Sequence, residues 1–299
     1  MVVQERDRAA LRAVARHRYL TSDHIQALAY PGTARRICQF RLRRLWEHGF
    51  LDRLHLPVVL AGNQRGRQNN RPLYMLARRG AEVASADTDA SLFELPHTPA
   101  QNAAGYGYLA HNLVATDFLV ALEVACRGRT DVELVAVERE TTLRKRLAVS
   151  QDRSPAVVSD GAFTLRYPDD GRRVTFHLEV VRAGVKGGNN NLRQKFERYV
   201  ALNRAGYFAR VFGHDQVRAV LVVTTSPTRV EHLRALAASL PHGRRLFWFT
   251  CYEEVRSIGV PVTSFTASNV LSPIWRTAID ELPLSLLPTV PVPRLGSAA

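Results

Sequence analysis

The chain has few cysteines and few lysines, and it lacks long hydrophobic runs. Its three cysteines, Cys38, Cys126 and Cys251, are odd in number, far apart and without the spacing of metal ligands. This excludes a disulfide framework and a cysteine-based zinc site. No apolar run reaches the roughly 20 residues that a membrane span needs, and the first residues lack the apolar core of a signal peptide. We therefore expect a cytoplasmic protein without a membrane partner.

Lysine provides only three of the 41 cationic side chains, a skew that is typical of a GC-rich genome. The number of arginines alone therefore does not identify DNA contacts, but their location is informative. The first 80 residues hold sixteen arginines and five acids, a formal charge of +11 out of +14 for the whole chain. A field of this size attracts polyanions. The sequence therefore predicts that the N-terminal part binds nucleic acid.

The N-terminal part reads as a small helical domain, within a chain of 299 residues that is long enough for two cores. Apolar spacing predicts helices over 5–18, about 21–28 and about 33–48, with an N-cap at Thr21 and a left-handed glycine at Gly49. We expect Ile37, Leu42, Leu45 and Trp46, with Phe40 or Arg41, to lie along one face of the third helix. Two strands, 50–54 and 71–76, flank the polar, basic stretch 61–71. Three helices followed by such a hairpin predict a winged helix-turn-helix domain over residues 1–84.

The rest of the chain alternates helices and strands. We interpret 85–105 as a linker, 106–281 as an α/β domain and 282–299 as a proline-rich tail that is extended or loose. Within the α/β domain we expect helices over 108–126, 192–203 and 227–239, and strands over 132–138, 162–167, 174–181, 218–224 and 245–250. This order implies an α/β sandwich with a mixed sheet.

The third helix and the hairpin tip carry the candidate DNA contacts. In helix-turn-helix proteins, residues near the start of the second helix of the motif meet base edges, and arginine donates both to guanine edges and to phosphates. The alternative is a solvated helix face on an arginine-rich protein. The residues that we predict to contact DNA are Thr33, Arg35, Arg36, Gln39, Arg43, Arg65, Arg67 and Arg71.

Seven short motifs are distributed along the chain, and Lys195 and Tyr199 follow the last of them. The motifs are RDRAAL at 6–11, HRYLT at 17–21, RLRRLWEHGFL at 41–51, YMLARRG at 74–80, LAHNL at 109–113, SDGAF at 159–163 and FHLE at 176–179. With these motifs the chain resembles the replication-relaxation proteins of plasmids and integrated mobile elements. The resemblance implies a winged helix joined to a domain shaped like the PD-(D/E)xK nucleases.

The nuclease shape implies a particular site. Such sites hold two acids on neighbouring strands that bind a divalent metal, and a lysine two residues after the second acid. Asp160 and Glu179 would be the two acids and the Mg²⁺ ligands, but Val181 stands where the lysine belongs, and Lys195 on the following helix is its candidate replacement. Gln194 and Tyr199 resemble the helix signature of one nuclease branch. Glu123 or Asp117 would add a further carboxylate.

Three functions remain open on the sequence. The first is a homodimeric double-stranded-DNA-binding protein of a mobile element, acting in plasmid replication control or transcription, with a degenerate nuclease-like domain used for assembly. In that case no cofactor is expected, and Asp160 caps a turn while Glu179 pairs with Arg182 or Lys195. The second is a Mg²⁺-dependent DNA endonuclease targeted by the winged helix, with Asp160, Glu179 and Lys195 as catalytic residues. The third is a protein–protein adaptor whose charge is incidental.

Overall fold

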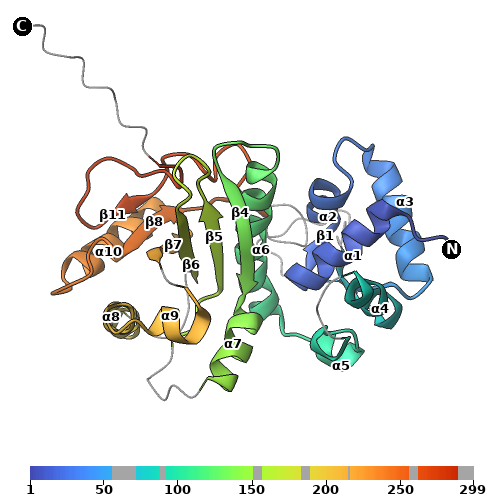
Figure 1. The fold of residues 1–299 in the computed structure, drawn as a ribbon, viewed down its shortest axis with the longest axis horizontal. Coiled ribbons are helices and arrows are strands. Elements are labelled where there is room, and N and C mark those ends of the chain that lie inside the picture. The colour runs from blue at the N-terminus through green and yellow to red at the C-terminus, as the bar shows by residue number, and fades with distance from the viewer. Residues whose placement is uncertain are drawn as a thin grey trace, which may run out of the picture.

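The computed structural model describes residues 1–55, 72–87, 92–150, 157–182, 189–214, 216–255 and 262–288. Figure 1 shows a helical N-terminal part beside a larger part built on a sheet, with the long helix α6 (Tyr106–Cys126) between them. The result is a mixed α+β protein, as the order of helical and strand-like segments predicts.

The N-terminal part packs four helices against a short antiparallel sheet of order β1-β3-β2. Thr21 caps the second helix by accepting from the backbone N–H of His24 at 3.2 Å, and Gly49 follows the third with φ +71°, both as predicted. The hairpin tip that joins β2 to β3 lies outside the described residues. The elements are α1 (Glu5–His17), β1 (Leu20–Thr21), α2 (Ser22–Ala29), α3 (Arg35–Glu47), β2 (Leu51–His55), β3 (Pro72–Leu76) and α4 (Arg78–Ala86).

The helix α3 turns a different face to the core than the sequence predicts. Cys38, Leu42 and Leu45 are buried, whereas Ile37 and Phe40 are 47% and 57% exposed. Arg41 points inward instead, where it forms an ion pair with Asp7, a carboxylate that is fully buried in α1. The predicted face was therefore wrong at Ile37 and at Trp46, which is 37% exposed, and of the two alternatives at its centre, Phe40 or Arg41, the inward one is Arg41, because an internal ion pair replaces an apolar contact.

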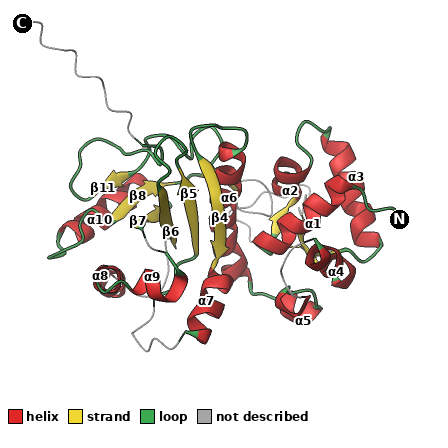
Figure 2. Cartoon of the chain, in the orientation of Figure 1, coloured by secondary structure: helices red, strands yellow, loops and turns green. Residues whose placement is uncertain are grey.

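Residues 92–105, part of the predicted linker, contain the 3₁₀ turn η1 (Leu92–Glu94) and the helix α5 (Pro99–Asn102). The larger part then contains a mixed sheet of order β11-β8-β7-β6-β5-β4 (Figure 2). The strands β4 to β6 are antiparallel, β6 to β8 are parallel, and β11 is antiparallel to β8. The elements are β4 (Glu133–Arg139), α7 (Glu140–Val149), β5 (Gly161–Arg166), β6 (Arg173–Val181), α8 (Asn189–Arg204), α9 (Tyr207–Phe212), β7 (Val217–Thr224), α10 (Pro227–Ala238), β8 (Phe247–Cys251), β9 (Glu254–Val255), β10 (Val262–Thr263) and β11 (Arg276–Thr277).

Each face of this sheet has its own core. Phe118 of α6 packs with Phe163 and Trp275 on one face, while Phe196 of α8 stacks on Phe247 on the other. The helices α7 and α9 were not predicted. They are short, and the sequence of α7 is charged with a single fully buried leucine, so its apolar pattern is weak.

The helix α6 is shared between the two parts. The expectation that no apolar run reaches the length of a membrane span was wrong for this helix: Gly107–Cys126 is long and apolar enough to cross a membrane, but 83% of its most apolar stretch is buried inside the protein. Val120 joins the N-terminal core, whereas Leu119 and Leu122 join the core of the sheet. A long apolar helix is expected where a helix has protein on several sides.

The beginning of the predicted tail packs against the sheet domain. Leu286 is 1% exposed, its carbonyl accepts a hydrogen bond of 2.6 Å from Tyr167, and Leu284 forms a β-bridge with Trp275. Residues 282–288 are therefore not loose, because Leu284 and Leu286 pack against the apolar core of the sheet domain.

Candidate functional site: a cationic helix face and a buried carboxylate pair

The outer face of α3 is the first candidate site. Four of the predicted DNA-contacting residues lie on this helix, and all four are exposed: Arg35, Arg36, Gln39 and Arg43. Their availability differs. Arg35 pairs with Asp23 at 2.9 Å and Arg43 with Glu47 at 2.7 Å, both at the surface. Arg36 makes no ion pair within the described residues, so its guanidinium is open to solvent.

The polar groups of Thr33 form hydrogen bonds within the protein. It lies in the turn before α3, where its hydroxyl accepts from Arg6 at 2.8 Å and its carbonyl accepts from Gln26 at 2.9 Å. These bonds hold the entry to the helix. The remaining predicted contacts, Arg65, Arg67 and Arg71, lie outside the described residues.

The carboxylate pair is the second candidate site. In the antiparallel pairing of β5 and β6, Gly161 lies opposite Leu178, so the register brings Asp160 beside Glu179 at the end of β5. Asp160 Oδ2 accepts from the backbone N–H of Val180 at 2.7 Å, which fixes the acid to the neighbouring strand. Because the β5–β6 turn sets this register, the sequence order alone brings the two acids together.

The helix α8 supplies two partners for Glu179, which is 3% exposed. Lys195 Nζ lies 2.5 Å from Glu179 Oε2, and the hydroxyl of Tyr199 donates to Oε1. Lys195 and Tyr199 are four residues apart and so lie on the same side of the helix. The structure therefore brings Asp160, Glu179 and Lys195 together, as the sequence predicts, and adds Tyr199.

His111 completes the surroundings of Asp160. It reaches across from α6, and its Nε2 lies 2.9 Å from Asp160 Oδ1. His111 is not among the site residues predicted from the sequence, although it lies within the motif LAHNL. The carboxylates proposed for this role, Asp117 and Glu123, lie elsewhere: Asp117 accepts from His24 and the backbone of Thr263, and Glu123 pairs with Arg16 and His17. Both acids join the two parts of the molecule and do not contribute to the site.

Burial and neighbouring charges set the protonation of this group. Burial, with the nearby charge of Asp160, raises the pKa of Glu179 despite Lys195. Burial also acts to raise the pKa of Asp160, but the hydrogen bond and charge of His111 outweigh it, and the pKa is lowered. The charge of Glu179 outweighs the burial of Lys195 and raises the pKa of that ammonium group. The lysine therefore stays charged while the two acids differ in their affinity for a proton.

The carboxylate pair does not form a metal cage as it stands. Among the described residues no group of three or more histidine, cysteine, aspartate or glutamate side chains is placed to hold a metal ion. All four carboxylate oxygens of Asp160 and Glu179 already have a partner, and Val181 supplies no charge. Two monodentate carboxylates bind a hard cation weakly. The residues present therefore do not fit a tightly held Mg²⁺ ion.

A second polar cluster lies behind the first. Ser159, next to Asp160, hydrogen-bonds His177 at 2.9 Å, His177 contacts His214 at 3.2 Å, and His214 contacts Glu138 at 2.5 Å. Burial lowers the pKa of His177 to about 3, so its ring is neutral. The spacing of His177 and Glu179, two residues apart on one strand, was the signal in the sequence that these side chains share a face.

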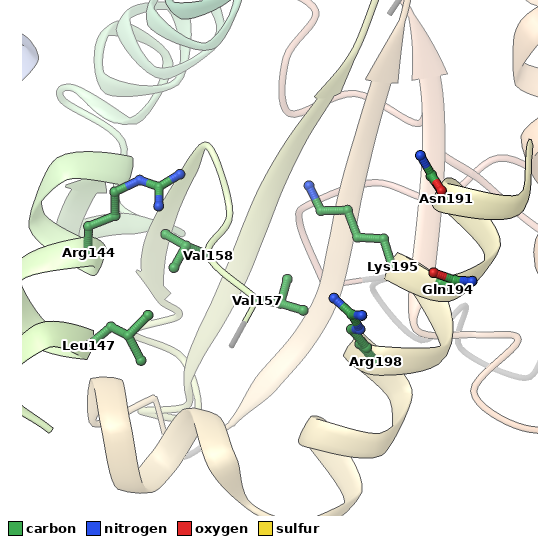
Figure 3. A pocket seen from close by; sticks show the side chains of 8 residues that line it. All are labelled: Arg144, Leu147, Val157, Val158, Asn191, Gln194, Lys195 and Arg198. Carbon is green, nitrogen blue, oxygen red and sulfur yellow. The ribbon is translucent and has the colours of Figure 1, made fainter. Parts of the chain in front are cut away.

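A cleft of about 500 Å³ opens beside Lys195 (Figure 3). Arg144 and Leu147 of α7 form one wall, and Val157 and Val158 precede β5. The opposite wall is the face of α8 that carries Asn191, Gln194, Lys195 and Arg198, spaced as one helical stripe. The predicted Gln194 thus lies beside the site. The arrangement can hold an anion in front of the carboxylate pair.

One of the three comparisons with known proteins agrees with the sequence motifs. No curated protein sequence matches the chain. A solved structure of the SdaI restriction endonuclease aligns over 83% of this chain and 85% of that chain, at 12% identity and a TM-score of 0.25, which is too slight a likeness to support an argument. The family model described as replication-relaxation matches residues 11–216, more than half of the chain. This match confirms the resemblance seen in the motifs, and the chain belongs to the replication-relaxation family.

Proposed function

We propose that this replication-related protein of a mobile element binds double-stranded DNA through the outer face of α3. The observation that carries the proposal is the exposed set of Arg36 and Arg43 on the helix side opposite the core, with the exposed Gln39 on the flank of the same helix. Arginine donates in pairs to guanine edges and to phosphates, and glutamine donates to and accepts from adenine. The field of the N-terminal part draws the duplex toward this face.

The arrangement around α3 supports this proposal. The three helices α1 to α3, followed by the paired strands β2 and β3, are typical of a winged helix-turn-helix, in which the third helix enters the major groove. The basic stretch between β2 and β3 would act as the wing. We further propose a cytoplasmic homodimer, because two half-sites multiply affinity, and a role of the sheet domain in assembly. Control of plasmid replication or of transcription follows from such binding.

Capture of genomic and plasmid fragments by the full chain, followed by sequencing, tests the proposal. We expect one enriched sequence, and a binding constant that falls steeply with salt. Arg36→Ala should weaken binding to that sequence about tenfold or more. Arg193→Ala is the matched control, because Arg193 is a surface arginine of α8 that pairs with Glu197 and lies far along the chain from α3. A flat salt dependence without enrichment would sink the proposal.

A Mg²⁺-dependent endonuclease is the second candidate. The observation that favours it is the convergence of Asp160, Glu179 and Lys195 at the end of neighbouring strands, beside a cleft lined with cations. Against it stand Val181 and the absence of a third metal-binding side chain among the described residues. The chain's own residues would hold a phosphodiester in the cleft through Arg144, Lys195 and Arg198.

Nicking of supercoiled plasmid in Mg²⁺ or Mn²⁺ tests this second candidate. Activity that is lost in both Asp160→Ala and Glu179→Ala, but is kept in Arg193→Ala, would support the endonuclease. Intact plasmid in both metals, with DNA binding retained, would leave the sheet domain as a scaffold for assembly.

A further inference from the structure

Phe40 occupies the centre of the outermost ridge of α3. At about 100° per residue, the buried line through Cys38, Leu42 and Leu45 lies opposite positions 36, 40, 43 and 47. Phe40 is 57% exposed and is the most exposed of the large apolar side chains on this helix. Any surface that lies against the outer face of α3 must therefore cover this ring.

The neighbours of Phe40 restrict the partner. Arg36 lies one turn before it, and Arg43, which pairs with Glu47, lies one turn after it, so the ridge carries a net positive charge. A partner must therefore be anionic and must offer an apolar spot at the centre of the contact. A second copy of the same face fits poorly, because it brings arginine against arginine, and like charges facing each other oppose association.

The major groove of DNA meets both requirements. Its walls are phosphates, and the 5-methyl group of thymine is the apolar group that it displays. We infer that Phe40 is a specificity-determining residue that contacts a thymine methyl group in the major groove. This inference rests on the proposed DNA binding and adds the chemistry of the base that is recognised.

Replacing single thymines by uracil in the enriched sequence tests the inference, since uracil lacks only the methyl group. For the unaltered protein we expect one thymine in each half-site whose replacement weakens binding about three- to fivefold, as burial of one methyl group predicts. In Phe40→Ala this difference should fall below twofold, and in Phe40→Leu it should be partly kept. Ile279→Ala is the matched control, because Ile279 is a 47% exposed apolar residue of the sheet domain, outside α3.

The outcomes separate the two proposals. An equal uracil penalty in the unaltered protein and in Phe40→Ala overturns this inference and leaves DNA binding by α3 intact. Dissociation of a dimer by Phe40→Ala, measured by sedimentation velocity without DNA, also overturns it and assigns the ring to contact between copies. Failure to enrich any sequence overturns the proposed function and this inference together.

Discussion

The helices α3 and α8 each carry a row of cationic and amide side chains, and they use them differently. On α8, Lys195 is held by Glu179, an acid that is almost fully buried. On α3, the inward Arg41 is held in the same way by Asp7, whereas Arg36 on the outer face has no acidic partner among the described residues. Arginine content therefore does not show which cations are available to a ligand. A cationic side chain is available to a ligand only where the fold does not place a buried acid against it.

The largest effect should come from removing the acid beneath α3. Asp7 accepts from the backbone of Gln4, from Tyr30 and from Arg41, and it is fully buried. Asp7→Ala leaves Tyr30 without its acceptor and Arg41 with only the carbonyl of Val2, so we expect the free energy of unfolding to fall by about 3–5 kcal/mol. Urea denaturation measures this. Glu5→Ala, at an exposed acid of the same helix, should cost less than about 1 kcal/mol, and similar losses in both variants would contradict the assignment.

The next effect concerns the contact between the two parts. Burial lowers the pKa of His17 to about 4, although Glu123 opposes the shift. His17 in the unfolded chain therefore takes up a proton near pH 6.5, whereas His17 in the folded protein takes it up only near pH 4. The free energy of unfolding therefore falls as the pH drops from 6.5 toward 4. His17→Gln keeps a donor for Glu123 but does not titrate. Between pH 7 and 4.5 the unaltered protein should lose about 2 kcal/mol more than the variant. Parallel pH profiles of urea denaturation would exclude this role.

A smaller effect is expected on α8. Lys195→Met removes the cation from the buried Glu179 but leaves Tyr199 in place, so we expect a loss of about 1–2 kcal/mol in the free energy of unfolding, since the lysine is partly exposed. Arg198→Met, at an exposed residue of the same cleft, should change it by less than about 0.5 kcal/mol. If the two variants lose the same amount, Lys195 is not bound more tightly than its neighbour.

The smallest effect should appear on the outer face of α3. Glu47 holds Arg43 at the surface, and Glu47→Ala releases this arginine and removes a negative charge from the face. We expect affinity for the enriched DNA to rise about twofold, with no change in stability, because exposed pairs contribute little. Glu82→Ala, which breaks a similar pair with Arg78 on α4, serves as the control in the same titration. Unchanged binding in Glu47→Ala would place Arg43 outside the contact.

Local signals in the sequence predicted much of the fold. The cap at Thr21 and the left-handed Gly49 lie where short-range chemistry requires them. Five strands of the large sheet, β4 to β8, lie within a few residues of their predicted positions, whereas the two-residue edge strand β11 was not predicted. The helices α7 and α9 escaped prediction because they are short and their stability comes from packing against the sheet domain.

The distribution of arginines along the sequence alone determined that the N-terminal part is strongly basic. The order of the predicted strands placed Asp160 and Glu179 on neighbouring strands of a sheet. Tertiary structure decided which side chains meet across long separations. Only the fold directs Arg41 inward and Phe40 outward, and only the fold brings His111 from α6 to Asp160 while turning Asp117 and Glu123 toward the N-terminal part. The physical reason is that a helix repeats its faces along the sequence without specifying which face meets the core. That choice depends on the packing and charge pairing of residues that are distant in the chain.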